Sequence, residues 1–221
     1  MDCFSSDFHL SHGNILKYSR RDAFLSAIDK AELDRRGGHW GEREEPWRIS
    51  QESVDLMNDT IINNTNKVVG RNDLLWFLGD FCFSYDKRNY AAVARRFRDR
   101  INCQHINYIF GNHDKQRRVL ADLFNECYDL VSIKIGEESV VLCHYALAVW
   151  DKRHFGAINL YGHSHSDAEG WLSEIMPGRR SMDVGIDNAA KILGEYRPFS
   201  WDEVLTFLPK PDKLYKHHSD Q

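Results

Sequence analysis

Short apolar runs recur along the chain, and longer segments with a helical period separate them. A nearly continuous apolar run that is bounded by glycine, aspartate or asparagine is typical of a buried strand. The runs that fit this description are Cys3–Ser6, Leu74–Leu78, Ile106–Phe110, Val140–Cys143, Asn159–Tyr161 and Ser181–Gly185.

Three of the intervening segments have helical spacing. The first is Ala23–Arg36, and Gly37–Gly38 after it is a stop signal. Ser50 is a candidate N-cap for the second. The apolar positions that carry the helical period are Val54, Met57, Ile61 and Ile62 in the second segment and Val93, Phe97 and Ile101 in the third. The alternation of strands and helices predicts an α/β layered domain.

The chain has 221 residues, of which 42% are hydrophobic and 28% are charged. This is enough for one sizeable α/β domain with its own core, so we expect a single domain over residues 1–221. Residues 37–47 are polar and rich in glycine around two tryptophans, and we interpret them as a surface excursion. We expect a frayed tail from about residue 213.

Composition narrows the class of partner. The net charge of −4 does not indicate a protein that coats nucleic acid, although nucleic acid stays open as a partner. No apolar run approaches the roughly 20 residues that span a bilayer, and we see no signal peptide. The five cysteines are odd in number and lack CxxC spacing. This usage is typical of reduced thiols, so we expect a cytoplasmic protein.

Metal-ligating side chains follow five of the predicted strands at the same end. In order along the chain they are Asp7 and His9, then Asp80, then Asn112 with His113 and Asp114, then His144, and finally His163 and His165. Ligands of open α/β sheets bind at the carboxyl ends of the strands. Five such coincidences make a purely structural account improbable, and they indicate a metal site at the C-terminal strand ends.

The spacing within these groups suits chelation. Residues i and i+2 of an extended segment point to the same side, so we expect Asp7 with His9, and His163 with His165, to form pairs. Glycine precedes three of the groups and allows a sharp turn with a close backbone approach. Imidazole, carboxylate and one amide suit Mn²⁺, Fe, Ni or Zn better than Ca²⁺ or Mg²⁺. Seven candidate ligands are too many for one ion, and two ions that share a carboxylate would use them.

With these groups of candidate ligands, the sequence resembles the calcineurin-like metallophosphoesterase superfamily. The signature of that family is D-x-H, G-D, G-N-H-[D/E], H and G-H-x-H, in this order. Here the blocks read "DFH", "GD", "GNHD", "CH" and "GHSH", between residues 7 and 165. The start "SSDFHLSHGNI", together with "CHYAL" and "MDVGID", looks like a subgroup of small bacterial and phage phosphoesterases.

The resemblance implies two mixed β-sheets flanked by helices, with two divalent metals at one edge. One ion would be held by Asp7, His9, Asp80 and His165, and the other by Asp80, Asn112, His144 and His163. The two ions would clamp the phosphate and lower the pKa of a bridging water, which becomes the attacking hydroxide. His113 would protonate the leaving oxygen, and Asp114 would orient His113. Asn112 would also contact the substrate.

The sequence therefore predicts a binuclear-metal phosphohydrolase, and most simply a phosphodiesterase that acts on a cyclic nucleotide or another small diester. A phosphomonoesterase or a nucleic-acid end-processing enzyme is the alternative. A metal-free interaction scaffold of the same fold is a third hypothesis, but such a protein should have lost ligands.

Several other residues carry weaker signals. His12 either contacts the substrate phosphate or caps the following helix. The basic residues after "GNHD" either bind a second phosphate or form a solvated helix face, and the arginines of 95–100 are most simply solvated. The loop after His144 either stacks on a base or packs internally. The basic residues after "GNHD" are Lys115, Arg117 and Arg118, and the arginines of 95–100 are Arg95, Arg96, Arg98 and Arg100. The residues of the loop after His144 are Trp150, His154 and Phe155. Arg179 and Arg180 could also reach the site.

Overall fold

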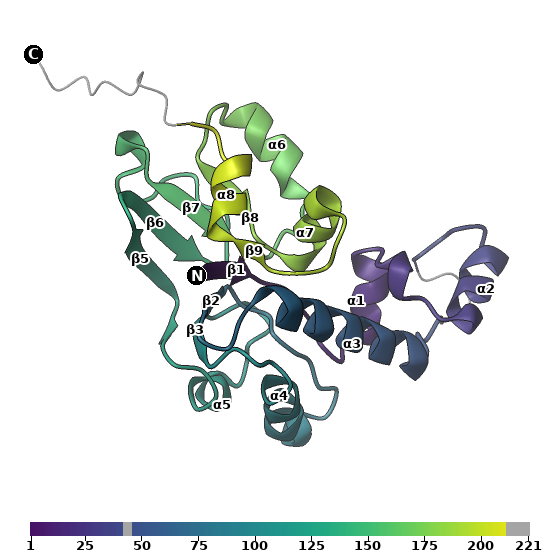
Figure 1. Ribbon diagram of the computed structural model, residues 1–221. Helices are drawn as coiled ribbons and strands as arrows, with labels where there is room; N and C mark the ends of the chain where they lie inside the picture. The colour runs from purple at the N-terminus through teal and green to yellow at the C-terminus, as the bar shows by residue number, and fades with distance from the viewer. Residues whose placement is uncertain (42–45, 211–221) are drawn as a thin grey trace, which may run out of the picture.

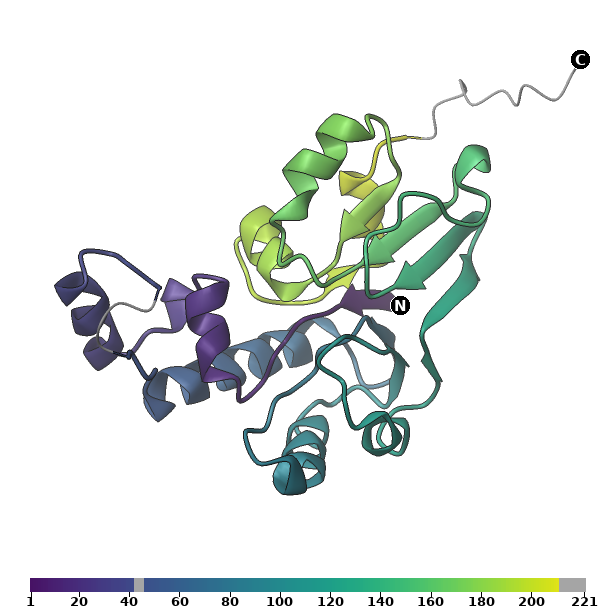
Figure 2. The ribbon, with the colours of Figure 1, turned by 180° about the vertical axis from the view of Figure 1, so that it is seen from behind.

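The computed structural model of the protein describes residues 1–41 and 46–210 and contains two mixed β-sheets with helices around them (Figures 1 and 2). The first sheet has the order β4-β3-β2-β1-β9 and the second β5-β6-β7-β8. The strands are β1 (Asp2–Ser5), β2 (Leu74–Phe77), β3 (His105–Ile109), β4 (Cys127–Tyr128), β5 (Leu130–Ile135), β6 (Glu138–Cys143), β7 (Ile158–Tyr161), β8 (Ser181–Asp183) and β9 (Phe199–Ser200). The expected fold of two mixed sheets flanked by helices is confirmed.

Parallel pairing dominates both sheets. Strands β1, β2, β3 and β4 are parallel, and only β9 pairs antiparallel with β1. In the second sheet β5 and β6 form an antiparallel pair, while β6, β7 and β8 are parallel. The carboxyl ends of the parallel strands in each sheet therefore lie at one edge, which is where ligands of such sheets bind.

Helices flank the two sheets. In Figures 1 and 2, α4 and α5 lie on one side of the molecule, α6, α7 and α8 lie on the other, and α1 and α2 stand beside the far end of α3. The helices are α1 (Gly13–Tyr18), α2 (Ala27–Arg35), α3 (Gln51–Val68), α4 (Tyr90–Arg98), α5 (Arg117–Ala121), α6 (Ala168–Ile175), α7 (Ile186–Leu193) and α8 (Trp201–Phe207), with short 3₁₀ turns at Asp22–Phe24, Lys87–Asn89 and Arg153–Phe155.

The alternation of side chains along the strands builds two separate cores. Phe4, Trp76 and Ile109 point from the first sheet towards the second, where Leu142 and Leu160 meet them. The opposite face of the first sheet packs against the helices. Its cluster includes Cys3, Leu75, Phe77, Ile106, Met57, Ile61 and Phe97. Strands that are buried on both faces read as continuous apolar runs, which is why the sequence shows them clearly.

The predicted helix boundaries are partly confirmed. The Ser50 side chain accepts a hydrogen bond from the Ser53 N–H and caps α3 as expected. The segment Ala23–Arg36 is not one helix, because a 3₁₀ turn precedes a new start at α2. Ser26 caps that start, and its hydroxyl accepts from the Asp29 N–H. A capped restart satisfies backbone donors that a continuous helix would have bonded internally.

Residues 37–47 were expected to form a surface excursion, but the last of them is buried in the structure. Residues 42–45 lie outside the described part of the chain, but Trp47 is buried and its indole donates to Asp29 at 3.0 Å. Asp29 also accepts from the hydroxyls of Ser50 and Ser53, both at 2.5 Å, so it joins α2 to the start of α3. The tail that was expected from about residue 213 also lies outside the described residues.

Two further expectations concern the cysteines and membrane-spanning helices. All five cysteines are free thiols. Within residues 1–41 and 46–210, no helix combines the length and the apolar character needed to cross a membrane.

The capping box of α8 gives a test of the local fold. The Ser200 hydroxyl accepts from the Glu203 N–H, and the Glu203 carboxylate accepts from the Ser200 N–H at 2.9 Å. Ser200→Ala should lower the free energy of unfolding by about 1 kcal/mol, because an orphan donor loses its partner. The melting temperature should fall by about 2–4 °C. Ser173→Ala, in the exposed middle of α6, is the control and should cause no loss.

Candidate metal centre

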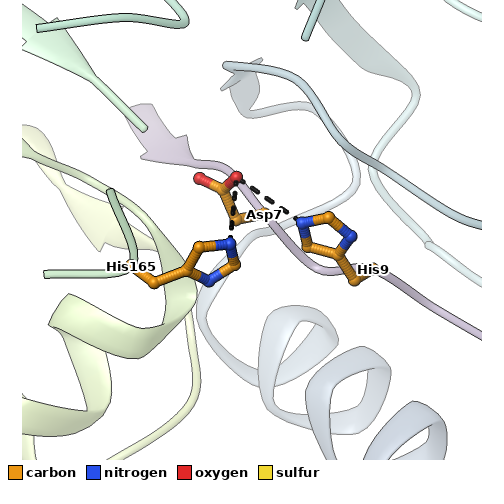
Figure 3. A group of neighbouring side chains, drawn as sticks. All are labelled: Asp7, His9 and His165. Carbon is orange, nitrogen blue, oxygen red and sulfur yellow. Dashed lines mark ion pairs between the residues drawn. The ribbon is translucent and has the colours of Figure 1, made fainter. Parts of the chain in front are cut away.

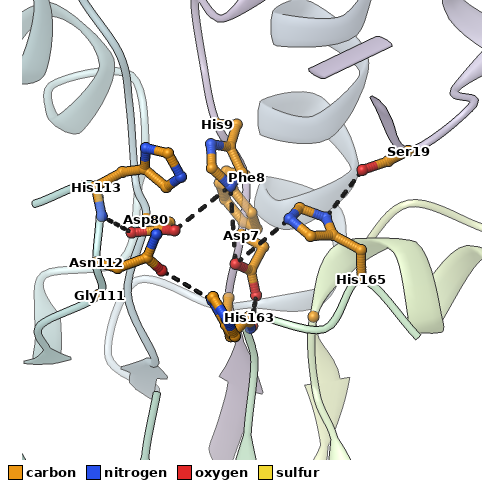
Figure 4. Close-up of polar contacts among 12 residues, drawn as sticks. Asp7, Phe8, His9, Ser19, Asp80, Gly111, Asn112, His113, His163 and His165 are labelled. Atoms are coloured by element: carbon orange, nitrogen blue, oxygen red, sulfur yellow. Dashed lines mark hydrogen bonds and ion pairs between the residues drawn. The ribbon is translucent and has the colours of Figure 1, made fainter. Parts of the chain in front are cut away.

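The loops that follow β1, β2, β3, β6 and β7 converge at one edge of the two sheets (Figure 4). The first three loops come from the first sheet and the last two from the second. They bring together all seven residues that the sequence indicates as ligands, which are Asp7, His9, Asp80, Asn112, His144, His163 and His165. The centre therefore forms only where both sheets meet.

The backbone of this centre is not extended, contrary to the expectation from i and i+2 spacing. The φ angles are 58° at Asp7, 49° at His9, 59° at Asp80, 68° at His163 and 48° at His165. Each is in the left-handed region, which costs roughly 1–2 kcal/mol for a residue with a Cβ. Strain of this kind is held by the surroundings: the Asp7 N–H donates to the Gly79 carbonyl and the His9 N–H to the Asp80 carbonyl.

Glycines leave room for these turns, as the sequence indicates. A Cβ at Gly79 would collide with the His144 ring and the backbone of Gly111. A Cβ at Gly111 would overlap the carboxylate of Asp80, and one at Gly162 would overlap that of Asp7. The three glycines thus permit loops from different strands to pass within contact distance of the carboxylates.

The first group of potential ligands is Asp7, His9 and His165 (Figure 3). The Oδ1 atom of Asp7 lies 3.8 Å from His9 Nε2 and 3.9 Å from His165 Nε2. Its other oxygen accepts from the Ser6 hydroxyl at 2.5 Å and from the His163 N–H at 2.9 Å. One oxygen is therefore fixed by the protein while the other faces two imidazoles.

The second group is Asp7, Asp80 and His144. The Oδ2 atom of Asp80 lies 3.5 Å from His144 Nε2 and 3.6 Å from His9 Nε2, so it stands between a ring of each group. Its Oδ1 atom accepts from the His113 N–H at 2.8 Å. The two groups overlap in Asp7, and Asp80 is close to both.

Asn112 and His163 complete the cluster beside His144. The Oδ1 atom of Asn112 lies 2.9 Å from His144 Nε2 and 2.8 Å from His163 Nδ1. The His144 Nδ1–H donates to the Leu78 carbonyl at 2.6 Å and so leaves Nε2 directed at Asp80. A ring whose second nitrogen bonds to a carbonyl is oriented in the way that metal-ligating histidines are.

The donor set fits a cation. Asp7 and His9 are buried, and Asp7 Oδ1 and His9 Nε2 have no hydrogen-bond partner within the described structure. Buried polar atoms without a partner are costly unless another group, such as a metal, satisfies them. Nitrogen and oxygen donors without thiolate suit Mn, Fe, Ni or Zn. The residues present could therefore hold a divalent metal ion.

The electrostatics of the cluster show the same demand for positive charge. Burial alone would raise the pKa of Asp7, but the neighbouring imidazoles of His9, His165 and His144 outweigh it and lower the pKa. Burial would lower the pKa of His144, but contact with Asp80 and the charge of Asp7 outweigh it and raise the pKa to about 9. The two buried carboxylates therefore favour positive charge beside them.

Two carboxylates that the sequence analysis did not assign support the histidines of the second sheet. Asp187 of α7 accepts from His165 Nδ1 at 2.6 Å, which leaves Nε2 facing Asp7. Asp183 at the end of β8 accepts from the Ser164 hydroxyl and the Ser166 N–H, so it fixes the loop that carries His165. Both lie in the "MDVGID" stretch, which was the available sequence signal.

His113 and Asp114 lie beside the centre in different environments. The His113 ring is exposed and meets the His9 ring at 5.2 Å between centroids. Asp114 is buried and accepts from the Asp80 N–H, the Gly111 N–H and the Tyr108 hydroxyl. The bonds of Asp114 therefore hold the backbone around Asp80, whereas an orienting contact with the His113 ring was expected.

His12 lies next to His9. Its ring stacks on Phe83 at 4.3 Å, and its Nδ1 is 3.4 Å from His9 Nδ1. It occupies the N-cap position of α1, but its side chain makes no capping hydrogen bond. Burial, together with the charges of His9 and His113, lowers the pKa of His12 to about 3. The missing capping bond removes the helix-capping alternative, and contact of His12 with the substrate stays a prediction.

Several of the weaker basic and aromatic candidates have structural partners. Arg179 pairs with Glu169 and Arg180 with Glu138, so neither points into the metal centre. The Trp150 indole is buried and donates to the Ala157 carbonyl, whereas Phe155 is exposed. Other contacts are those of Arg117 with Asp129 and Phe110, of Arg98 with the carbonyls of Ile101 and Gln104, of Arg96 with the Phe97 ring, and of Arg100 with Asp59. Lys115, Arg118 and Arg95 are exposed, so their roles stay predictions.

Comparisons with known proteins support the fold. No family model matches the chain. The uncharacterized protein MJ1445 of Methanocaldococcus jannaschii is 27% identical over 205 residues, which cover 93% of this chain and 89% of that protein. The protein of unknown function AQ665 from Aquifex aeolicus has a TM-score of 0.59 at 21% identity and covers 94% of this chain and 99% of its own. The latter likeness shows a shared fold.

A novel archaeal phosphodiesterase is a more distant structural neighbour. It has a TM-score of 0.38 at 15% identity, with 87% of each chain covered. At this TM-score the likeness supports no conclusion about this chain.

The close approach at Gly162 gives a test of the centre. Gly162→Ala should displace Asp7, because the added Cβ overlaps its carboxylate and the Ser6 hydroxyl. We expect Mn²⁺ affinity to fall at least about tenfold, measured by isothermal titration of chelator-stripped protein. The control is Gly170→Ala in α6, where a Cβ meets open space and the substitution should be neutral or stabilising. Unchanged affinity in Gly162→Ala would contradict the placement of Asp7.

Proposed function

We propose that the protein is a binuclear metal-dependent phosphodiesterase that hydrolyses a small phosphodiester, such as a cyclic nucleotide. The observation that carries the proposal is the placement of Asp80 Oδ2 between His9 and His144, 3.6 and 3.5 Å from their Nε2 atoms. A carboxylate in this position can serve two ligand groups at once. The resemblance of the five sequence blocks to calcineurin-like metallophosphoesterases supports the same conclusion.

The residues that would hold the ions form two sets. Asp7, His9 and His165 would hold one ion, and His144, Asn112 and His163 the other, with Asp80 between them. Two bound divalent cations would supply charge stabilisation for the phosphate and a water of lowered pKa. Mn²⁺ is the first choice, with Fe, Zn or Ni as alternatives.

His113 would protonate the leaving oxygen. Its backbone N–H is fixed by Asp80, while its exposed ring stands beside His9 at the rim of the centre. A general acid must reach the leaving group and exchange its proton with solvent. The exposure of His113 supports this role, whereas buried His12 is held against Phe83.

A small diester is favoured over nucleic acid by the charge distribution. The net charge is −4, and of the four arginines in residues 95–100, Arg98 and Arg100 bond to carbonyls or to Asp59, which leaves only Arg95 and Arg96 exposed without an ion pair in the described structure. A surface that tracks a polynucleotide needs Lys and Arg side chains that are free to contact successive phosphates.

The free thiols support a reducing, cytoplasmic location for the protein.

The substrate class is tested with a panel of phosphate esters on Mn²⁺-loaded protein. We expect hydrolysis of bis(p-nitrophenyl) phosphate and of a cyclic nucleotide at rates at least equal to those of matched monoesters. Chelator should remove the activity and Mn²⁺ should restore it. A strong preference for monoesters would favour the phosphatase alternative, and full activity after verified removal of metal would refute the metal-dependent mechanism.

Asp80→Ala tests the shared carboxylate. Because Asp80 borders both ligand groups, we expect the variant to bind both ions more weakly and to show no measurable hydrolysis. The exposed Asp55→Ala on α3 is the control and should retain both. Metal content is measured by atomic emission after gel filtration, and a wild-type content in Asp80→Ala would rule out the shared site.

His113→Ala separates proton donation from metal binding. We expect the variant to keep its metal content and to lose about 10²–10⁴-fold in turnover on an alkyl diester, the usual scale for general acid catalysis. A nitrophenolate leaves without a proton, so its loss should be much smaller. Rates over diesters of graded leaving-group pKa should fall more steeply than in wild type, and parallel slopes would mean that His113 has another role.

A further inference from the structure

We infer that Arg21 and Asp187 act together as positioning residues that align the two halves of the metal centre. The inference rests on the metal centre of the proposed function, and it assigns a role to two residues outside the ligand set. Arg21 lies between α1 and the 3₁₀ turn at Asp22–Phe24 and is completely buried. Asp187 lies in the first turn of α7.

Every N–H donor of Arg21 has an acceptor. Nε and one Nη donate to the two oxygens of Asp187, each at 2.8 Å. The same Nη donates to the Asp7 carbonyl at 2.8 Å, and the other Nη donates to the Phe8 carbonyl at 3.0 Å and to Met57 Sδ at 3.4 Å. A guanidinium has five N–H groups in a rigid plane, so this arrangement uses all of them.

These contacts connect the two sheets through their ligands. The carbonyls of Asp7 and Phe8 belong to the left-handed turn that presents Asp7 and His9 from the first sheet. Asp187 Oδ2 bonds to Nδ1 of His165, a ligand from the second sheet, at 2.6 Å. One guanidinium thus fixes the strained turn and, through one carboxylate, the ring that faces it.

The geometry requires a fork and not only a charge. A lysine ammonium could replace one or two of the contacts, but it cannot grip both oxygens of Asp187 while it reaches two carbonyls. The ion pair is also buried, since the side chains of Arg21 and Asp187 are 0% and 8% exposed. A buried charge that loses its partner is strongly unfavourable, so the two residues form one unit.

The chain offers a matched control in Arg180. It too is buried, grips both oxygens of Glu138 at 2.8 and 3.0 Å, and donates to the carbonyls of Gly156 and Pro209. None of these partners is a proposed ligand. Arg180→Lys therefore removes a fork of the same kind and should affect stability without affecting the metal centre.

The test measures metal binding by the chelator-stripped full-length protein. We expect Asp187→Asn and Arg21→Lys to lose about 10- to 100-fold in Mn²⁺ affinity at one of the two sites, the scale of outer-sphere effects on metals. The absorption spectrum of bound Co²⁺ should change in both variants. Arg180→Lys should bind both ions as wild type does. The double variant Arg21→Lys/Asp187→Asn should lose no more Mn²⁺ affinity than the single variant with the larger loss, because the effects of coupled residues are not additive.

Several outcomes would overturn the inference. They are wild-type affinity in both single variants, equal loss in Arg180→Lys, and additive losses in the double variant. If Arg21→Lys does not fold, the nearly isosteric Asp187→Asn decides alone. A wild type that binds two ions but hydrolyses no phosphoester would contradict the proposed function and leave this inference standing.

Discussion

The burial of Asp7 and Asp80 between the two sheets is the constraint on which the rest of the centre depends. Asp7 is 0% and Asp80 is 2% exposed. Carboxylates removed from water cost several kcal/mol unless charge and hydrogen bonds compensate them. Backbone N–H groups of His163 and His113 satisfy one oxygen of each, and the remaining oxygens lie near imidazoles and near each other's carboxylate. The glycines, the left-handed turns and the histidines all serve to bring compensating groups to these two oxygens.

The division of the candidate ligands between two sheets would couple metal binding to folding. Asp7, His9 and Asp80 come from the first sheet, while His144 and His165 come from the second. In the unfolded chain these residues are far apart, so a bound ion would favour the folded state. At a free concentration one hundred times the dissociation constant, one such site would contribute about 2.7 kcal/mol, a sizeable part of the stability of a domain.

The sequence predicted those parts of the fold whose signal is local. Strands buried on both faces appear as continuous apolar runs, and six of them were found. The edge strand β5 alternates exposed and half-buried positions and has little to distinguish it from a loop. The β9 strand has two residues and pairs with β1 from the other end of the chain, so its existence depends on a distant partner.

That the candidate ligands lie close together was also predictable, because each lies in a loop that follows a strand. Their conformation was not, since left-handed φ angles at Asp and His are uncommon even though these residue types adopt them more readily than most. The contact between Arg21 and Asp187 spans 166 positions and has no spacing rule. Asp114 shows the same limit: the motif places it beside His113, but three hydrogen bonds direct it to the loop of Asp80.

The histidines of the centre divide into two kinds, and the division fits the roles that we propose for them. His144 and His165 each have one ring nitrogen fixed, by the Leu78 carbonyl and by Asp187, so the other nitrogen points at a carboxylate in one tautomer. The His113 ring is exposed and has no side-chain hydrogen bond to the residues that the structure describes. A ligand must keep its lone pair in one direction, whereas a proton donor must lose and regain a proton in each cycle. In the proposed mechanism the fold therefore orients the ligands His144 and His165 through buried partners, while Asp80 holds the backbone N–H of His113 and the exposed His113 ring lies beside His9.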